Sequence, residues 1–271
     1  MDRVTKTKLA FVVSLHVKHS KEGVRSITHR LAMEHFDKLN CSPDDHVLYV
    51  GYGDEAVILA TRANSVVVID LDPTLLEIGK SDRPADNVEY LQDDLGEGSP
   101  HLANWGESFS QVVSIVRVMF YPNVPLVLRN MVGCLKPGGQ LLCVIPNNDF
   151  NFFGGAAKVI EDHPEWGQRV KKSNVTLWNH TEEQAEEFFQ GICDWSELSC
   201  KTQRIDFGLA EKKAKLVLLD ALDEVNQVGS SHQEECLKTL WQWALNEYGC
   251  TEDGCLKKPS EFMVIYGVKR T

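Results

Sequence analysis

The sequence predicts an α/β protein built around a parallel β-sheet, and three observations favour this fold class. Short runs of β-branched and aliphatic residues, such as "VVVID" at 66–70, recur through the first half of the chain. Runs of this kind are typical of strands that are buried on both faces. Helical stretches separate the runs, and repeated strand–helix–strand units form parallel sheets with right-handed crossovers. Asp72-Pro73 suits the start of one such helix, with aspartate as the cap and proline at the first helical position.

The first half of the chain supplies five of the expected strands. They are residues 47–50, 66–70, 88–91, 112–116 and 140–146. The helices expected between them are residues 55–62, 74–80 and 124–135. We expect the fourth strand to end in the aromatic residues of "FSQVVSIVRVMFY" and the fifth to follow the turn "KPGG".

The second half of the chain has a different pattern. Residues 147–180 are rich in Asn, Phe, Trp and Gly and show no strand pattern. Residues 181–192 form a helix with Thr181 as its cap and acids in its first turn. Residues 209–247 are helical with a break near "VGSS", and the expected strands are residues 196–207 and 261–270. No linker is apparent, so we predict a single domain over 1–271, with an N-terminal helical segment at 1–46 and a core at 47–146.

Composition and charge exclude several classes of function. The net charge is −11, with 39 acidic and 28 basic residues, which disfavours a nucleic acid partner. The eight cysteines lack zinc-ligand spacing, so we expect no metal, and free thiols favour a reducing, cytoplasmic location. The apolar run at 9–15 is too short to span a bilayer, and we interpret it as a packed helix or strand.

A glycine-containing turn follows the first expected strand in "VLYVGYGDEAVILA". Gly51 and Gly53 let backbone N–H groups approach a ligand at the start of a helix. Asp70 ends the next strand about 20 residues later, where a carboxylate can bind a ribose diol. Together these features predict a nucleoside ligand. Ala56 fits the dinucleotide fingerprint G-x-G-x-x-A, whereas Glu55 interrupts the G-x-G-x-G of S-adenosylmethionine enzymes.

Downstream motifs favour the second ligand class. The most specific is "LKPGG" at 135–139 before a strand. With it, the chain resembles a class I S-adenosylmethionine-dependent methyltransferase over 47–146. "VIPNNDFNFFG", the tail "WNHTEEQAEEFFQGICDWSELSCKTQRIDFG" and "EFMVIYGVKR" resemble the arthropod juvenile hormone acid methyltransferase group. The resemblance implies a Rossmann-like, seven-stranded, mostly parallel sheet with an antiparallel last strand. It also implies helices on both faces and a helical lid for the acceptor within 147–271.

The resemblance further implies where the cofactor, S-adenosyl-L-methionine, would bind. The matching positions are Gly51, Tyr52, Gly53, Asp70, Leu71, Asp94 and Leu95. The first three would lie against the methionine part of the cofactor. Asp70 would bind the ribose hydroxyls with Leu71 beside the adenine. Asp94 would face the adenine amino group, helped by the backbone of Leu95, although its neighbour Asp93 leaves the register open.

Three positions depart from the pattern of the family that the chain resembles. Tyr49 stands where an acid is usual, Glu55 where glycine is usual, and Met119-Phe120 where a His-Trp pair is usual. If the Glu55 carboxylate lay about 4 Å from the cofactor carboxylate, the repulsion between them would be roughly 4 kcal/mol at an effective dielectric of 20. In the first helical turn it could instead swing to water or face the positive groups of the cofactor. The sequence leaves the sign of its effect open.

The resemblance implies methyl transfer to a small apolar acceptor, which we expect to be the carboxylate of a terpenoid or fatty acid. A carboxylate is ionised at neutral pH and needs no general base, so no catalytic side chain is assigned. Candidate walls for this substrate are Phe120, Tyr121, Trp166 and Trp178, with Phe152 and Phe153 beside them. A hydroxyl or amine acceptor would need a base such as His163 or His180. The alternatives are a catalytically inactive relative that binds or scaffolds, and a dinucleotide oxidoreductase.

Overall fold

The computed structural model describes residues 23–51, 55–82, 84–96, 98–147, 152–171, 178–257 and 260–271. The chain divides into two compact units. Of the described residues, those within 28–147, 178–205 and 260–271 belong to the sheet unit, and those within 23–27, 152–171 and 206–257 belong to the helical unit. The apolar run at 9–15 lies outside the described residues. That both units form one domain, with the helices as an acceptor lid, stays a prediction.

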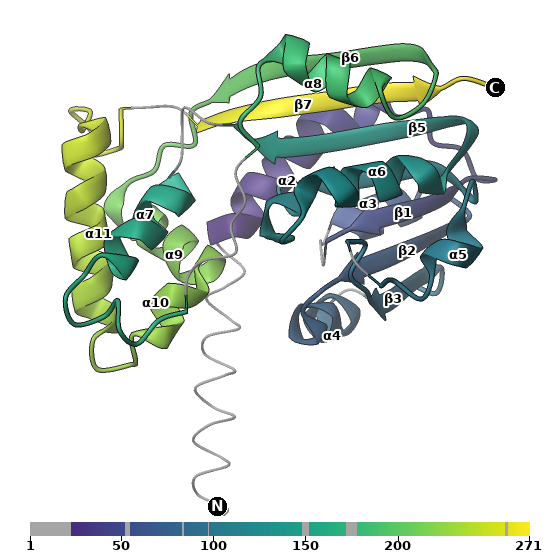
Figure 1. Ribbon diagram of the computed structural model, residues 1–271. Coiled ribbons are helices and arrows are strands. Elements are labelled where there is room, and N and C mark those ends of the chain that lie inside the picture. The colour runs from purple at the N-terminus through teal and green to yellow at the C-terminus, as the bar shows by residue number, and fades with distance from the viewer. Residues whose placement is uncertain are drawn as a thin grey trace, which may run out of the picture. The chain divides into compact units, whose positions relative to one another are not determined.

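The sheet unit contains a seven-stranded sheet with the strand order β3-β2-β1-β4-β5-β7-β6 (Figure 1). Its strands are β1 (His46–Val50), β2 (Ser65–Asp70), β3 (Val88–Gln92), β4 (Phe109–Ile115), β5 (Leu135–Pro146), β6 (Trp195–Ile205) and β7 (Ser260–Lys269). Neighbours among β1 to β5 pair in parallel, and β7 is antiparallel to both β5 and β6. The predicted Rossmann-like, mostly parallel sheet with an antiparallel last strand is therefore confirmed.

The central strands form because both of their faces are covered. All seven residues of β4 are buried, as are four of the five residues of β1. Burying a Val, Leu or Ile side chain stabilises the fold by about 1.5–3 kcal/mol, and β-branched residues suit the pleated backbone. This is why the aliphatic runs of the sequence mark the strands within a few residues.

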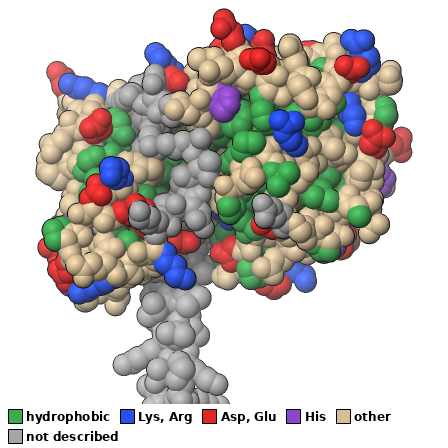
Figure 2. Space-filling model, in the orientation of Figure 1, with side chains coloured by type: hydrophobic (Ala, Val, Ile, Leu, Met, Phe, Trp, Pro, Cys, Tyr) green, Lys and Arg blue, Asp and Glu red, His purple; other side chains and the backbone are tan. Residues whose placement is uncertain are grey.

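Helices pack on both faces of this sheet, as predicted. They are α2 (Gly23–His35), η1 (Phe36–Lys38), α3 (Glu55–Ala60), α4 (Pro73–Asp82), α5 (Leu102–Trp105), η2 (Val118–Phe120), α6 (Val124–Cys134) and α8 (Glu182–Gln190). Figure 1 shows α6 and α8 in front of the sheet, with α2 and α3 behind it. On the α6–α8 side, Leu128 and Phe189 pack with Leu48 in one buried hydrophobic cluster. Figure 2 shows hydrophobic side chains that reach the surface on this side.

Local hydrogen bonds explain where the predicted helices begin. The Asp72 carboxylate accepts from the backbone N–H of Thr74 at 2.8 Å, so Asp72 caps α4 as expected. Thr181 and Gln184 form a reciprocal capping box at the start of α8. Both caps follow from residues within one helical turn, which is why the sequence reveals them.

The helical unit contains α7 (Phe152–Glu161), α9 (Glu211–Ala221), α10 (Asp223–Gln227) and α11 (Gln233–Tyr248). The last three confirm the helical stretch predicted over 209–247 and its break near 228–231. The prediction missed α7 because "FFGG" reads as a loop. Gly155 is needed there because a Cβ atom would lie 2.5 Å from the Trp243 ring. The glycine thus serves packing against α11.

Two boundaries differ from prediction at the end of β4 and the start of β5. β4 ends at Ile115, so the aromatic residues of "VMFY" lie in and after η2 and not in the strand. Val116 ends the strand because its backbone takes a φ of 59°, which is strained for a β-branched residue. β5 begins at Leu135 and includes the "KPGG" segment, where the pairing with β4 shifts register. Within the described ranges, no helix combines the length and apolarity needed to cross a bilayer.

Candidate functional site

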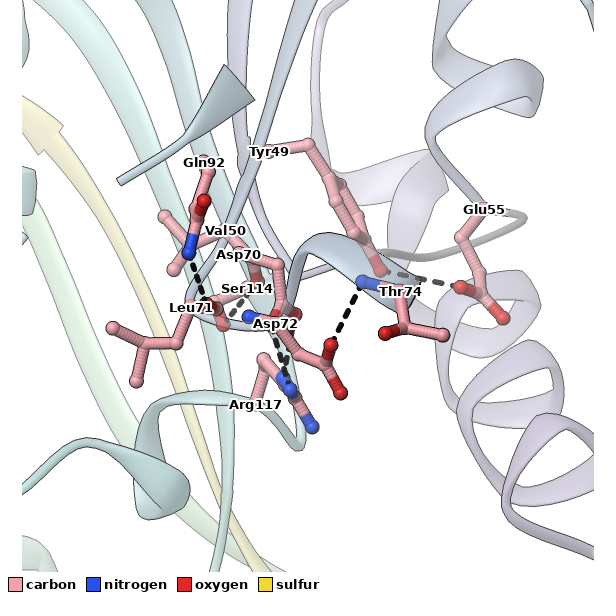
Figure 3. A network of polar contacts seen from close by, with 10 residues as sticks. All are labelled: Tyr49, Val50, Glu55, Asp70, Leu71, Asp72, Thr74, Gln92, Ser114 and Arg117. Atoms are coloured by element: carbon pink, nitrogen blue, oxygen red, sulfur yellow. Dashed lines mark hydrogen bonds and ion pairs between the residues drawn. The ribbon is translucent and has the colours of Figure 1, made fainter. Parts of the chain in front are cut away.

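The carboxyl ends of β1, β2 and β4 meet at one edge of the sheet and form the candidate site (Figure 3). The strand order reverses between β1 and β4, and ligands of open α/β sheets bind outside such a switch point. Gly51 follows β1, Asp70 ends β2, and Arg117 follows β4 after the strained Val116. The fold therefore collects residues that are up to 66 positions apart in the chain.

The Asp70 carboxylate is fully buried and forms a bidentate ion pair with Arg117. The Nε and Nη2 atoms of Arg117 each donate to a different oxygen of Asp70, both at 2.7 Å. The backbone N–H of Asp72 also donates to Asp70 at 2.9 Å. Such fork-to-fork contacts are the strong form of ion pair. Asp70 therefore stands at the predicted place, but in this conformation its carboxylate is held by a residue of the chain itself.

Gly51 gives Arg117 the space to reach Asp70. Gly51 has a φ of 137°, in the region that favours glycine. A Cβ atom here would lie 3.2 Å from Cγ of Arg117 and 3.4 Å from the Tyr49 ring. The Arg117 side chain therefore packs closely against the backbone of Gly51. Arg117 is not among the residues predicted from the sequence. Its only signal in the sequence is that an arginine directly follows a strand expected to be buried.

Tyr49 and Glu55, two of the departures from the family pattern, are hydrogen-bonded to each other. The Tyr49 hydroxyl donates to the Glu55 carboxylate at 3.2 Å, and Thr28 donates to its other oxygen at 2.9 Å. Glu55 is 1% exposed, so the suggestion that its side chain swings to water is wrong. The hydroxyl donors, together with the N-terminus of α3, explain why a carboxylate is tolerated here.

The loop after β3 carries the two acids whose register the sequence leaves open. Asp93 is buried, and its Oδ2 accepts from the Ser99 hydroxyl at 2.8 Å. Asp94 is half-buried, and its Oδ1 accepts from the backbone N–H of Gly96 at 2.7 Å. The greater exposure of Asp94 makes it the better candidate for a ligand contact. Leu95 is fully buried below it, in the cluster under α6.

Leu71 after β2 and the residues that follow β4 also belong to the described part of this edge. Leu71 is half-buried, and its carbonyl accepts from the Gln92 amide at 3.1 Å. Phe120 lies after β4 with the Arg117 guanidinium 4.9 Å from its ring centroid, a cation–π contact. Met119 and Tyr121 beside it are both 1% exposed. Burial, followed by the charge of Asp70, raises the pKa of the Tyr121 phenol well above its usual range.

The remaining predicted wall residues pack within the core of their own units. Trp178, in the sheet unit, is buried and stacks on His180 with ring centroids 4.0 Å apart. Burial lowers the pKa of His180. Trp166, in the helical unit, is buried and stacks on His163 at 3.7 Å. Tyr52 and Gly53 lie outside the described residues.

Two further features concern a cavity in the helical unit and the capacity of the described residues to bind a metal. A cavity of about 660 Å³ opens in the helical unit, lined by residues of α7 and α11 that include Lys158, Trp243 and Tyr248. The residues that line this cavity all belong to the helical unit, and the acids described above belong to the sheet unit. Over the described part of the chain, no group of three His, Cys, Asp or Glu side chains is arranged to hold a metal.

Comparison with known proteins finds a similarity to a methyltransferase domain in this region. Residues 48–143 match the family model described as a methyltransferase domain. The YcgJ protein of Bacillus subtilis superposes with a TM-score of 0.59 at 14% identity, over 90% of this chain and 99% of that one. Phosphoethanolamine N-methyltransferase 2 of Haemonchus contortus, solved with S-adenosylhomocysteine, superposes with a TM-score of 0.55 at 16% identity, over 89% of this chain and 53% of that one. The matched residues cover the strands β2 to β4 and most of β1 and β5, and the superposed structures share the fold of the sheet.

The same fold also carries other chemistry. The cyclase SpnF superposes with a TM-score of 0.53 at 12% identity, over 89% of this chain and 80% of that one. A search of curated protein sequences found no match to this chain. At these identities the structural likeness establishes the fold alone, so the function has to be argued from the site.

Proposed function

We propose that the protein binds S-adenosyl-L-methionine at the carboxyl edge of β1, β2 and β4 and transfers its methyl group. The observation that carries this proposal is the buried carboxylate of Asp70 at the end of β2, beside the glycine turn of β1. A buried carboxylate at a topological switch point suits the hydroxyls of a ribose. The methyltransferase domain match over 48–143 supports the same ligand.

The residues of the edge fit the nucleoside half of this cofactor once Arg117 leaves Asp70. Asp70 would accept from the ribose hydroxyls, and Asp94 would accept from the adenine amino group with Leu71 and Leu95 beside the ring. Gly51, with Tyr52 and Gly53, would lie against the methionine part. The bound cofactor would supply an electrophilic methyl group on a sulfonium. Arg117 is the residue that does not fit, because it occupies both oxygens of Asp70.

We propose a small, largely apolar carboxylic acid, such as a terpenoid or fatty acid, as the methyl acceptor. Met119 is buried at one of the two positions where the resembling family carries a His-Trp pair, and Phe120 stands at the other. A carboxylate acceptor requires no base at these positions, because it is already ionised at neutral pH. The chain then has to orient the acid and exclude water, which aromatic and aliphatic side chains can do. Phe120 and Tyr121 are the proposed wall in the sheet unit, with Trp166 and Trp178 as further candidates.

The ion pair favours a second candidate function, a catalytically inactive relative that binds or scaffolds. In this case Arg117 would close the nucleoside site permanently. Tyr49 and Glu55 would then stabilise the first turn of α3 without serving a cofactor.

Cofactor titration separates the two candidates. Calorimetric titration and thermal shift with S-adenosylmethionine and S-adenosylhomocysteine should show saturable binding. At one hundred times the dissociation constant, binding stabilises the fold by about 2.7 kcal/mol. Asp70→Asn should abolish the shift. No binding at millimolar cofactor would favour the inactive relative, and a response to NAD alone would favour an oxidoreductase.

Labelled cofactor then identifies the acceptor class. The protein is incubated with methyl-labelled S-adenosylmethionine and matched apolar acids, alcohols and amines. Methyl esters of the acids are the expected products, and products from the alcohols or amines alone would refute the carboxylate proposal. We further propose a reducing, cytoplasmic location, which the eight unpaired cysteines support, and no nucleic acid partner.

A further inference from the structure

The Tyr121 hydroxyl is a buried polar group with no hydrogen-bond partner among the described residues. The side chain is 1% exposed and packs in the hydrophobic cluster with Leu95, Val118 and Val124. Nearly all buried hydroxyls in folded proteins have a partner, since leaving one unpaired lowers stability. A side chain of phenylalanine would fill the same space without this penalty, so the hydroxyl calls for an explanation other than packing.

The surroundings of this hydroxyl connect it to the candidate site. Apart from burial itself, Asp70 and Arg117 act most strongly on the pKa of the phenol, followed by Asp94 and Asp93. These four charged residues lie at or just after the ends of β2, β3 and β4. Burial and the three carboxylates raise the pKa of the phenol, so Tyr121 stays protonated and its O–H remains available as a donor.

We propose that Tyr121 is a ligand-binding residue whose hydroxyl donates a hydrogen bond to an acceptor atom of the bound nucleoside. This inference rests on the proposed function, because it takes the nucleoside as the occupant of the edge. The carboxylates of Asp70 and Asp94 can only accept from the ligand when they are ionised. Tyr121 supplies the complementary donor for a ring nitrogen or ether oxygen. Tyr121 thus contributes a polar contact to the specificity for the nucleoside, in addition to its proposed place in the apolar wall around the acceptor.

Two matched tyrosine substitutions test the inference. Tyr121→Phe removes a hydroxyl that has no protein partner among the described residues. Tyr266→Phe removes a hydroxyl in β7 that accepts from the Gln140 amide at 2.9 Å. The chemical change is the same and both positions lie in the sheet unit, but Tyr121 directly follows η2 after the end of β4, whereas Tyr266 lies within β7. Unfolding in urea without ligand and calorimetric titration with S-adenosylhomocysteine are measured for both variants and the wild type.

We expect Tyr121→Phe to weaken S-adenosylhomocysteine binding by about tenfold, as for the loss of one hydrogen bond. Its urea midpoint without ligand should equal or exceed that of the wild type. Tyr266→Phe should lower the urea midpoint and leave the affinity unchanged.

Three results would overturn the inference. Equal affinity of Tyr121→Phe and wild type removes Tyr121 from the ligand site and leaves the proposed function intact. A lower urea midpoint for Tyr121→Phe shows that the hydroxyl has a structural partner in the protein. Absence of binding by the wild type as well refutes both the inference and the proposed cofactor.

Discussion

The ion pair between Arg117 and Asp70 makes the sharpest prediction about this protein. Arg117→Met keeps a side chain of similar length and removes its charge. The Asp70 carboxylate then remains fully buried without the two guanidinium hydrogen bonds that hold it at 2.7 Å. Removing one partner of a buried ion pair costs about 3–5 kcal/mol. Because the Arg117 side chain is 19% exposed, we expect the lower end, a loss of about 3 kcal/mol in the free energy of unfolding.

The same substitution should have the opposite effect on cofactor binding. In the wild type, the ribose can reach Asp70 only after the ion pair breaks, and this cost weakens the measured affinity. In Arg117→Met the carboxylate has no such competitor, so S-adenosylhomocysteine should bind at least about tenfold more tightly. Saturating ligand should then restore much of the lost stability, since binding to the folded state alone is stabilising.

Urea unfolding with and without S-adenosylhomocysteine measures both effects, and Arg204→Met is the matched control. Arg204 pairs with Glu261 at 2.8 Å, but its side chain is 67% exposed. Its loss should cost less than about 1 kcal/mol and leave the affinity unchanged. The reasoning is refuted if Arg117→Met unfolds at the wild-type urea concentration, or if it binds the ligand more weakly than the wild type does.

Three other predictions concern the stability of the two units. Tyr49→Phe removes a donor from the buried Glu55 carboxylate and should lower the free energy of unfolding by about 1.5–3 kcal/mol; an unchanged urea midpoint would contradict it. Gly155→Ala places a methyl group 2.5 Å from the Trp243 ring and should lower the free energy of unfolding by about 1–3 kcal/mol. Gly133→Ala in α6 is the control, because its methyl group meets no atom within 4 Å and should raise the free energy of unfolding by about 0.5–1 kcal/mol. Equal thermal midpoints of the two variants would contradict the packing of Gly155 against Trp243. Burial lowers the pKa of His35 below its usual 6.5, so the unfolded chain binds more protons and stability should fall as pH drops through 6.5. His35→Gln should show a smaller loss between pH 7.5 and 5.5 in urea titrations, and an identical slope would exclude His35 as the cause.

The elements of the sheet unit were largely predictable because the signals that form them are local. Aliphatic runs at 66–70 and 112–116 coincide with β2 and β4 because strands buried on two faces require continuous apolar side chains. The caps at Asp72 and Thr181 depend on residues two or three positions away. Elements without such signals escaped prediction. Helix α7 contains two glycines near its start, and Trp243 of α11, far along the chain, supplies the packing that explains Gly155.

The candidate site was predictable only in part, because its decisive contacts are not local. The spacing between Gly51 and Asp70 in the sequence was enough to predict an acid at the end of β2. Its partner Arg117 is 47 residues away and meets it because β1 places β2 and β4 on its two sides. One hydrogen-bond partner of Glu55 is likewise distant in the sequence, because Thr28 lies 27 residues earlier in the chain.

The amino-acid sequence by itself determined that this chain forms a parallel α/β sheet with a glycine turn and an acid at its carboxyl edge. Periodicity, turn residues and caps act over a few positions and need no knowledge of the packed chain. The tertiary structure alone decided which charges meet at that edge. A side chain separated by dozens of residues becomes a neighbour only when the strands are ordered in the sheet. In this protein that order brings an arginine onto the carboxylate proposed to bind ribose.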